Sequence, residues 1–117
     1  MDYKNLKVWQ ESLDLVEYVY NEVKLFPADE RFALVDQLKR AAVSIPSNIA
    51  EGSNRNTDKE FIQFLYIALG SAAEIETQLI IAQRLGYIGE SKKIMDKITQ
   101  IRKMLNALIG SIKRSTK

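Results

Sequence analysis

The 117-residue sequence contains no cysteine and no histidine. Without cysteine the chain can form no disulfide bond and no thiolate metal site, and it has no cysteine nucleophile. Without histidine it lacks the commonest general base and the commonest zinc ligand. Any catalysis would therefore rest on carboxylates, lysines or hydroxyls. We expect a protein that is not an enzyme and that carries no cofactor or metal.

Long hydrophobic runs are absent as well. The opening stretch MDYKNLKVWQES does not resemble a signal peptide, and no window approaches the roughly 18 uninterrupted apolar residues of a membrane-spanning helix. We therefore expect a cytoplasmic protein with no membrane partner. A hydrophobic content of 46% and a charged content of 27% are typical of a globular domain, and the length predicts a single domain over residues 1–117.

Proline and glycine are scarce, at two and five residues, and most of the chain keeps the apolar spacing of amphipathic helices. Pro27 disfavours helical geometry in the residue before it, and Asp29 is the expected N-cap of the next helix. Thr57 and Glu60 form a capping box, and Gly86 is placed to end the helix that follows. Four helices joined by short turns predict an all-α, antiparallel up-down-up-down four-helix bundle. They are expected at roughly 5–25, 30–53, 58–86 and 90–114.

Each predicted helix carries an apolar seam that is expected to face the core. The seam residues recur three or four positions apart, and the last helix keeps this rhythm most regularly. The four seams, in chain order, are Leu6, Trp9, Leu13, Val16, Tyr20 and Val23; Val35, Leu38, Ala42, Ile45 and Ile49; Phe61, Leu65, Ala68, Ala72, Ile75, Leu79 and Ala82; and Ile94, Ile98, Ile101, Leu105, Leu108 and Ile112.

The stretch RAAVSIPSNIAEGSNR, residues 40–55, departs from simple helical composition. A loop, a phosphate-binding turn and a kinked helix are three alternatives, but a phosphate-binding turn needs several glycines and only Gly52 is present. The apolar rhythm continues through Pro46, which favours a helix kinked at that residue. A serine nucleophile in this stretch would lack a recognisable oxyanion site. The residues assigned to this structural motif are Arg40, Ser44, Pro46, Ser47, Asn48, Glu51 and Gly52.

The third predicted helix is more apolar than one buried face requires. Beside its seam it carries further large side chains, and extra apolar faces on a soluble protein usually mark interfaces. The alternative is that neighbouring helices of the same chain cover them. We expect self-association through a candidate interface of Ile62, Tyr66, Leu69, Ala73 and Ile80.

Charge is unevenly distributed along the chain. Residues 1–89 carry nine basic and thirteen acidic residues, whereas residues 90–117 carry eight basic and two acidic ones. Positions 92, 103 and 114 are eleven residues apart, so they align on one side of a helix. This line is suited to phosphate contacts, and the alternative is a solvated helix face. The candidate nucleic-acid-binding residues are Lys92, Lys93, Lys103, Lys113 and Arg114.

A second charged set lies near residues 40–55 and on the third helix. We expect Arg40 to form an ion pair with Glu51 or Glu74, across helices or across subunits. A carboxylate metal site is the alternative, but such sites in helix bundles usually include histidine. The other members of this set are Arg55 and Glu76.

The motif in residues 40–55 resembles that of the four-helix-bundle proteins encoded by intervening sequences in bacterial 23S ribosomal RNA genes. The flanking stretches LKVWQESLDLVEYVY, FPADERFALVDQLKR and KEFIQFLYIALGSAAEIETQL extend the resemblance from Leu6 to about Tyr87. Phe32–Ala33 stands where the family commonly has Tyr–Gly. The matching positions are Trp9, Phe26, Pro27, Glu30, Gln37, Arg40, Ser44, Pro46, Asn48, Glu51, Gly52, Arg55, Gly70, Ser71 and Glu74.

This resemblance implies a ring-like or barrel-like homopentamer. The chain is also similar to the accessory protein of diversity-generating retroelements, a basic pentamer that binds nucleic acid and a reverse transcriptase. We therefore expect an oligomeric, non-enzymatic scaffold that binds RNA or DNA through the last helix, with a reverse transcriptase or another protein as a further partner. The alternative is a self-assembling structural or protein-binding module without nucleic-acid contact.

Overall fold

The computed structural model of the protein describes residues 2–115, and the regular secondary structure in that range is entirely helical. The expected all-α, four-helix fold is confirmed. The α-helices are α1 (Lys7–Glu22), α2 (Leu34–Ser53), α3 (Asp58–Arg84) and α4 (Lys92–Ser115), and three short 3-10 helices are η1 (Tyr3–Asn5), η2 (Val23–Leu25) and η3 (Ala28–Glu30).

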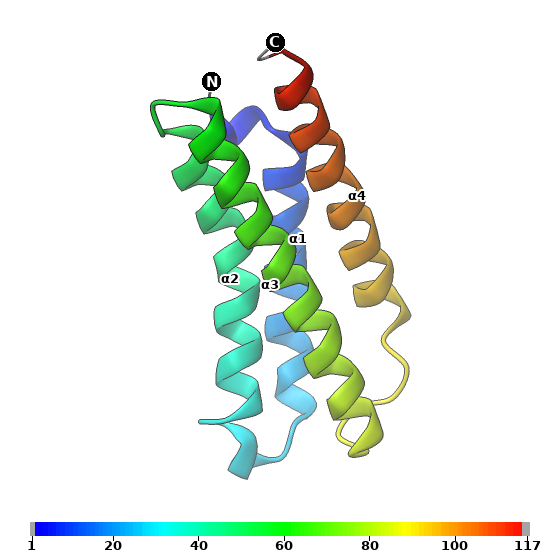
Figure 1. Cartoon of the computed structure of the whole chain (residues 1–117). Helices are drawn as coiled ribbons and strands as arrows, with labels where there is room; N and C mark the ends of the chain where they lie inside the picture. The colour runs from blue at the N-terminus through cyan, green and yellow to red at the C-terminus, as the bar shows by residue number, and fades with distance from the viewer. Residues whose placement is uncertain (1, 116–117) are drawn as a thin grey trace.

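The four α-helices lie side by side in an elongated bundle of about 49 × 23 × 20 Å. Figure 1 shows successive helices joined at alternate ends, with both ends of the described chain at the same end of the bundle. Each helix packs against the helices before and after it, and α4 also packs against α1. The contact between α2 and α3 is the most extensive. The helices α1 and α3 therefore lie on opposite corners of the bundle.

The predicted seams of α2 and α3 form the centre of the core. Every seam residue expected on these two helices is buried. Two polar contacts join the helices beside the apolar core: the hydroxyl groups of Ser44 and Ser71 lie 2.9 Å apart, and Gln78 donates to Gln37 over 3.1 Å. These contacts fix the register of α2 against α3.

The predicted seam of α1 is wrong in part, because Val23 is buried as expected whereas Leu13 and Tyr20 are exposed. The core face of this helix consists of Val8, Leu15, Val19 and Val23, with Ser12 among them. The buried Ser12 hydroxyl is satisfied locally, since it donates to the carbonyl oxygen of Trp9 over 2.6 Å. The helix carries two adjacent apolar stripes with the same spacing. The buried stripe includes the polar Ser12, so the sequence did not indicate that this stripe faces the core. Trp9, Leu13 and Val16 of the predicted seam lie beside α2 instead, where they line a hollow on the surface.

The start of the second helix and one seam position in α4 also need correction. The second helix begins at Leu34 rather than at 30, because Ala28–Glu30 forms a separate 3-10 turn and the Glu30 carboxylate, rather than Asp29, accepts the Leu34 N–H over 3.3 Å. In α4, Ile109 is buried and Leu108 only half buried. A straight helix drifts by about 20° per heptad, which accounts for this shift near its end.

Two predicted helix ends are confirmed. The Thr57 hydroxyl accepts the Glu60 N–H over 3.2 Å at the start of α3. At the other end Gly86 has a φ of +79°, and the Tyr87 N–H donates to the Ala82 carbonyl over 3.0 Å. This is the glycine-dependent helix ending that the sequence indicated.

The stretch 40–55 lies within α2 and its C-terminal turn, so the loop and phosphate-turn alternatives are excluded. The helix continues through Pro46, whose side chain is buried; a kink there stays a prediction. The Asn48 amide donates to the Ser44 carbonyl over 2.7 Å and to the Ser44 hydroxyl over 2.8 Å. These bonds support the backbone next to the missing proline donor.

Candidate nucleic-acid interface and self-association surfaces

The basic face of α4 comprises five exposed cationic residues, which are the candidates Lys92, Lys93, Lys103, Lys113 and Arg114. Their exposure follows from the helix geometry, because the isoleucine seam occupies the opposite side. Asp96 is the single acidic residue of α4, and its carboxylate pairs with Lys92 over 2.8 Å. This contact raises the pKa of Lys92, chiefly through the hydrogen bond to Asp96. Lys117, which adds charge in the sequence, lies outside the described residues.

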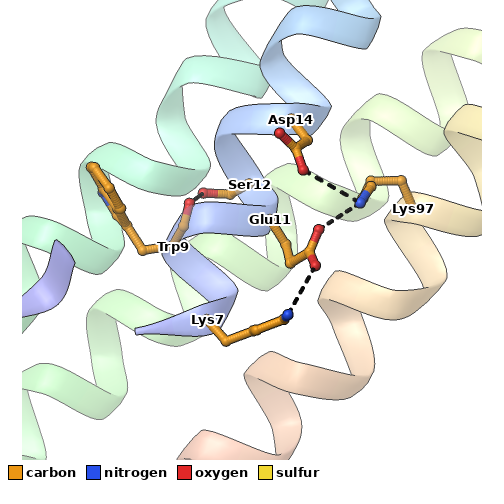
Figure 2. A network of polar contacts seen from close by, with 6 residues as sticks. All are labelled: Lys7, Trp9, Glu11, Ser12, Asp14 and Lys97. Atoms are coloured by element: carbon orange, nitrogen blue, oxygen red, sulfur yellow. Dashed lines mark hydrogen bonds and ion pairs between the residues drawn. The ribbon is translucent and has the colours of Figure 1, made fainter. Parts of the chain in front are cut away.

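Two other cations of α4 do not belong to this face. Figure 2 shows Lys97 directed between Glu11 and Asp14 of α1. The Lys97 ammonium lies 2.5 Å from a Glu11 carboxylate oxygen and 3.7 Å from Asp14, and both Lys97 and Glu11 side chains are only 14% exposed. Arg102 pairs with Glu76 of α3 over 3.2 Å. Both residues join α4 to the bundle; Lys97 is largely withdrawn from solvent, whereas the Arg102 side chain stays 44% exposed.

The Lys97 contact changes the acid–base properties of both partners. The hydrogen bond from Lys97 lowers the pKa of the Glu11 carboxyl, and the charges of Lys97 and Lys7 lower it further, against the opposing effect of desolvation. The same hydrogen bond raises the pKa of Lys97. The pair is therefore charged across the physiological pH range.

A tyrosine side chain contacts a lysine near each end of the basic face. The Lys93 ammonium lies 4.4 Å from the centre of the Tyr18 ring of α1. At the other end Lys113 donates to the Tyr66 hydroxyl over 3.1 Å. Cation–π contacts of this kind orient an exposed lysine without neutralising its charge. Lys103, between them, has no polar partner within residues 2–115.

The outer face of α3 is apolar and only partly covered. Of the candidate interface residues, Tyr66 and Ile80 are 49% and 43% exposed, and Ala73 is exposed. Ile62 and Leu69 are half buried against the core. The structure adds three exposed side chains that the predicted interface did not include, namely Ile67, Ile81 and Leu85. We call the exposed side of α3 between Tyr66 and Ile81 the α3 face. Ile62 lies before it and Leu85 after it.

By length and composition alone, α3 is long and apolar enough to cross a membrane, a property that core helices of soluble bundles share. In this chain the helix packs against α2 and α4 and buries its full predicted seam.

A second apolar surface lies between α1 and α2. It is an open groove of about 350 Å³, and we call it the α1–α2 groove. Sequence reasoning missed it, because the α1 residues that line it were expected in the core. Leu13 is 39% and Val43 42% exposed. The lining is almost entirely apolar: Tyr3, Trp9, Leu13, Val16, Val43, Pro46, Ser47 and Ala50.

Within one chain Arg40 does not form the ion pair expected with Glu51 or Glu74, and pairing across subunits stays a prediction. Arg40 pairs with Asp36 on its own helix over 3.0 Å, and its side chain is 80% exposed. Glu51 pairs with Arg55 over 2.8 Å. Both pairs join residues four apart in the sequence: Asp36 and Arg40 lie within α2, and Arg55 lies in the turn just after that helix. Glu74 forms no ion pair within residues 2–115, and its carboxylate accepts a hydrogen bond from the Gln78 amide over 3.4 Å.

Gly52 is required by the close approach of α2 and α3. A Cβ atom on Gly52 would lie 2.6 Å from Cβ of Phe64 and 3.0 Å from Cδ1 of Phe61. Gly70 is different, because a Cβ atom there would have no neighbour within 4 Å. Packing inside the monomer therefore explains the first glycine and not the second.

Two other positions that match the family, Phe26 and Glu30, contact Tyr87 just after the end of α3. The Tyr87 hydroxyl donates to the Glu30 carboxylate over 3.1 Å, which raises the pKa of Tyr87. The Phe26 ring packs against the Tyr87 ring with centres 5.7 Å apart. These contacts fasten the turn between α1 and α2 to the end of α3.

No group of three or more acidic side chains suited to a metal ion occurs in the part of the chain that the structure describes. The Ser44 hydroxyl is engaged with the Ser71 hydroxyl and the Asn48 amide. Ser47 is exposed on the rim of the α1–α2 groove.

Residues 4–107 match the family described as 23S rRNA-intervening sequence protein. The chain belongs to this family. Among solved structures it is similar to a protein of unknown function from the S23 ribosomal protein family of Bacteroides thetaiotaomicron, with 30% sequence identity and a TM-score of 0.79. That similarity covers 87% of this chain and 97% of the other. A comparison with curated proteins finds no match.

The family match spans α1, α2, α3 and most of α4. It ends before Lys113 and Arg114, two of the five residues of the basic face. Neither the family description nor the related structure names an activity. The α1–α2 groove, the α3 face and Lys92, Lys93 and Lys103 all lie within or along the matched range.

Proposed function

We propose that this family member is a non-enzymatic, self-assembling scaffold that binds RNA or DNA through the basic face of α4. The observation that carries the nucleic-acid part is the row of exposed cations on α4, opposed within that helix by Asp96 alone. The exposed α3 face and α1–α2 groove support the self-assembly part. We expect the scaffold to act in the cytoplasm and to use a second protein, such as a reverse transcriptase, as a further partner.

Assembly would multiply a modest local charge. In a ring of five copies, each basic face would recur around the assembly and form a belt. Lysine and arginine contacts to phosphates give affinity without reading sequence. The tyrosines beside Lys93 and Lys113 already contact these lysines, so they support positioning of the cations rather than stacking of bases.

A titration of fluorescent RNA and DNA at several salt concentrations tests the nucleic-acid part. We expect binding at low salt that weakens steeply as salt rises, because phosphate contacts release counterions. Replacing Lys103 by alanine should weaken binding to all sequences alike and lower the salt slope by about one, because one phosphate-neutralising charge is removed. Lys24→Ala removes the same charge from the turn after α1 and is the matched control; it should leave binding unchanged.

The second candidate is a self-assembling module that binds a protein partner and no nucleic acid. One observation favours it: three of the five cations already have intramolecular partners, in Asp96, Tyr18 and Tyr66. Failure to bind nucleic acid at low salt, with the assembly intact, would support this candidate and contradict the first.

A further inference from the structure

Two unlike faces carry exposed apolar side chains along the helices, while Leu25, Phe32 and Leu85 lie outside both. The α1–α2 groove is a hollow with the buried Pro46 at its base, and the α3 face is a helix surface with small residues at Gly70 and Ala73. Because α1 and α3 occupy opposite corners of the bundle (Figure 1), the two faces point in different directions. A single molecule cannot bring them together.

The two faces carry complementary charges at their edges. Arg40 lines a neighbouring hollow that shares Val43 with the groove; its side chain is 80% exposed and pairs with Asp36 of its own helix. Glu74 lies on the exposed side of α3 and has no cationic partner within residues 2–115. A groove with an exposed cation beside it and a helix face with an anion that has no cationic partner among the described residues suit each other.

The charged residues also lie at the same height in the bundle. Ser44 of α2 contacts Ser71 of α3, and Gln37 contacts Gln78. Arg40 falls between the two α2 residues just as Glu74 falls between the two α3 residues. A rotation about an axis parallel to the helices preserves height. Such a rotation therefore brings Arg40 of one copy to the level of Glu74 of the next.

We propose that a second copy of this chain occupies the groove: the α3 face of one copy inserts into the α1–α2 groove of the next, with Arg40 facing Glu74. This inference rests on the self-assembly in the proposed function and specifies which surfaces meet. The contact joins two different faces, so each copy has one groove and one α3 face to offer. Repeated contacts of this kind close into a ring when the rotation allows it.

The match extends along the rest of the two faces. Val43 projects from the groove edge at the level of Gly70 and Ala73, where small residues leave room for it. Gly70 lies in a helix interior, where glycine is unfavourable, and no neighbour in its own chain requires it. The close approach of a second copy provides the missing reason.

Charge reversal tests the pairing. Arg40→Glu and Glu74→Arg should each raise the dissociation constant for self-association about tenfold, because like charges would then face each other across the contact. The double variant should recover to within about threefold of the parent chain, because opposite charges would again face each other across the contact. Sedimentation velocity over a concentration series measures these changes, with circular dichroism as the check on folding. A double variant as weak as the single ones would overturn the proposal.

Mixing two blocked variants tests the head-to-tail geometry. Val43→Arg blocks the groove and Ala73→Arg blocks the α3 face, so each variant alone should be monomeric. Mixed together, they should form a one-to-one heterodimer through the remaining intact pair of faces, and nothing larger. The absence of a heterodimer, or a Val43→Arg variant that assembles like the parent chain, would overturn the proposal.

These outcomes separate this inference from the proposed function. A parent chain that is monomeric would defeat both the inference and the self-assembly part of the function. A parent chain that assembles while Val43→Arg has no effect would defeat the inference alone. Lys103→Glu provides the matched control, because it should weaken RNA binding and leave assembly unchanged.

Discussion

The Lys113 ammonium donates a hydrogen bond to the Tyr66 hydroxyl over 3.1 Å and lies 5.6 Å from the centre of its ring. Lys113 belongs to the basic face of α4, and Tyr66 belongs to the α3 face. The two candidate surfaces therefore meet at this contact. A second copy seated on the α3 face would approach Lys113 as well as Tyr66.

This contact predicts different effects for two lysines of the same face. Lys113→Ala should weaken both self-association and RNA binding, because it removes a phosphate-binding cation that also orients Tyr66. Lys103→Ala should weaken RNA binding only. Sedimentation velocity and RNA titration on the same preparations check this. Equal effects of the two variants in both assays would contradict the placement of Tyr66 at the contact between copies.

Gly52→Ala should destabilise the fold by about 1–3 kcal/mol, because the added methyl group would overlap Phe64 where α2 and α3 approach closely. Gly110→Ala is the matched control in another helix. There the nearest atom is the flexible end of Arg114, so the change should be neutral or stabilise the helix by about 0.5–1 kcal/mol. Urea unfolding of both variants measures the difference. A Gly52→Ala chain as stable as the parent would contradict the packing described for this position.

The Ser44–Ser71 hydrogen bond should contribute a coupling of about 0.5–1.5 kcal/mol to the free energy of unfolding. A double-mutant cycle of Ser44→Ala, Ser71→Ala and the double variant measures it. Each single variant should be destabilised, since it leaves one hydroxyl without its cross-helix partner, and the double variant should lose less than the sum. Strict additivity would mean that the contact does not stabilise the register of α2 against α3.

The Lys97–Glu11 pair predicts a pH dependence of stability. The pKa of Glu11 is lowered below its ordinary value of 4.5 in the folded chain. Its contribution is therefore fully present above about pH 4.5 and is lost as the pH falls through the lowered value. Lys97, whose pKa is raised above 10.5, contributes below that pH and loses its contribution only as the pH rises through the raised value.

Glu11→Gln should accordingly reduce stability at pH 7 and make its decline below pH 4.5 shallower. Glu17→Gln is the control, because this exposed residue of α1 makes no ion pair in the described range. Thermal unfolding at pH 7, 5, 4 and 3 compares the two. A Glu11→Gln variant whose stability falls as steeply in acid as that of the parent would contradict the role of the pair.

The number and type of helices could be predicted from the sequence because apolar residues recur three or four positions apart along each helix, even in α3, which carries further apolar side chains beside its seam. Thr57 and Gly86 marked helix ends through local chemistry that needs no tertiary contact. The α1 seam could not be assigned, since two apolar stripes run along that helix and only packing decides which is inside. The buried Ser12 occupies the position that would have distinguished them.

Of the candidate surfaces, too, some could be predicted from the sequence and others could not. Charge spacing found the basic face of α4, because exposure of a lysine row follows from the seam on the opposite side. The inward turn of Lys97 could not be foreseen, since it depends on Glu11 and Asp14 of a helix distant in sequence. The cross-helix partner expected for Arg40 was replaced by Asp36, four residues away. The α1–α2 groove was hidden by the error in the α1 seam.

Sedimentation equilibrium of the full chain tests the central claim, that apolar surface left exposed by one copy is covered by another. We predict a particle several times the 13.4 kDa mass of the chain at micromolar concentration, dissociating on dilution, with five copies as the expected state. A particle of 13.4 kDa at every concentration would contradict this claim.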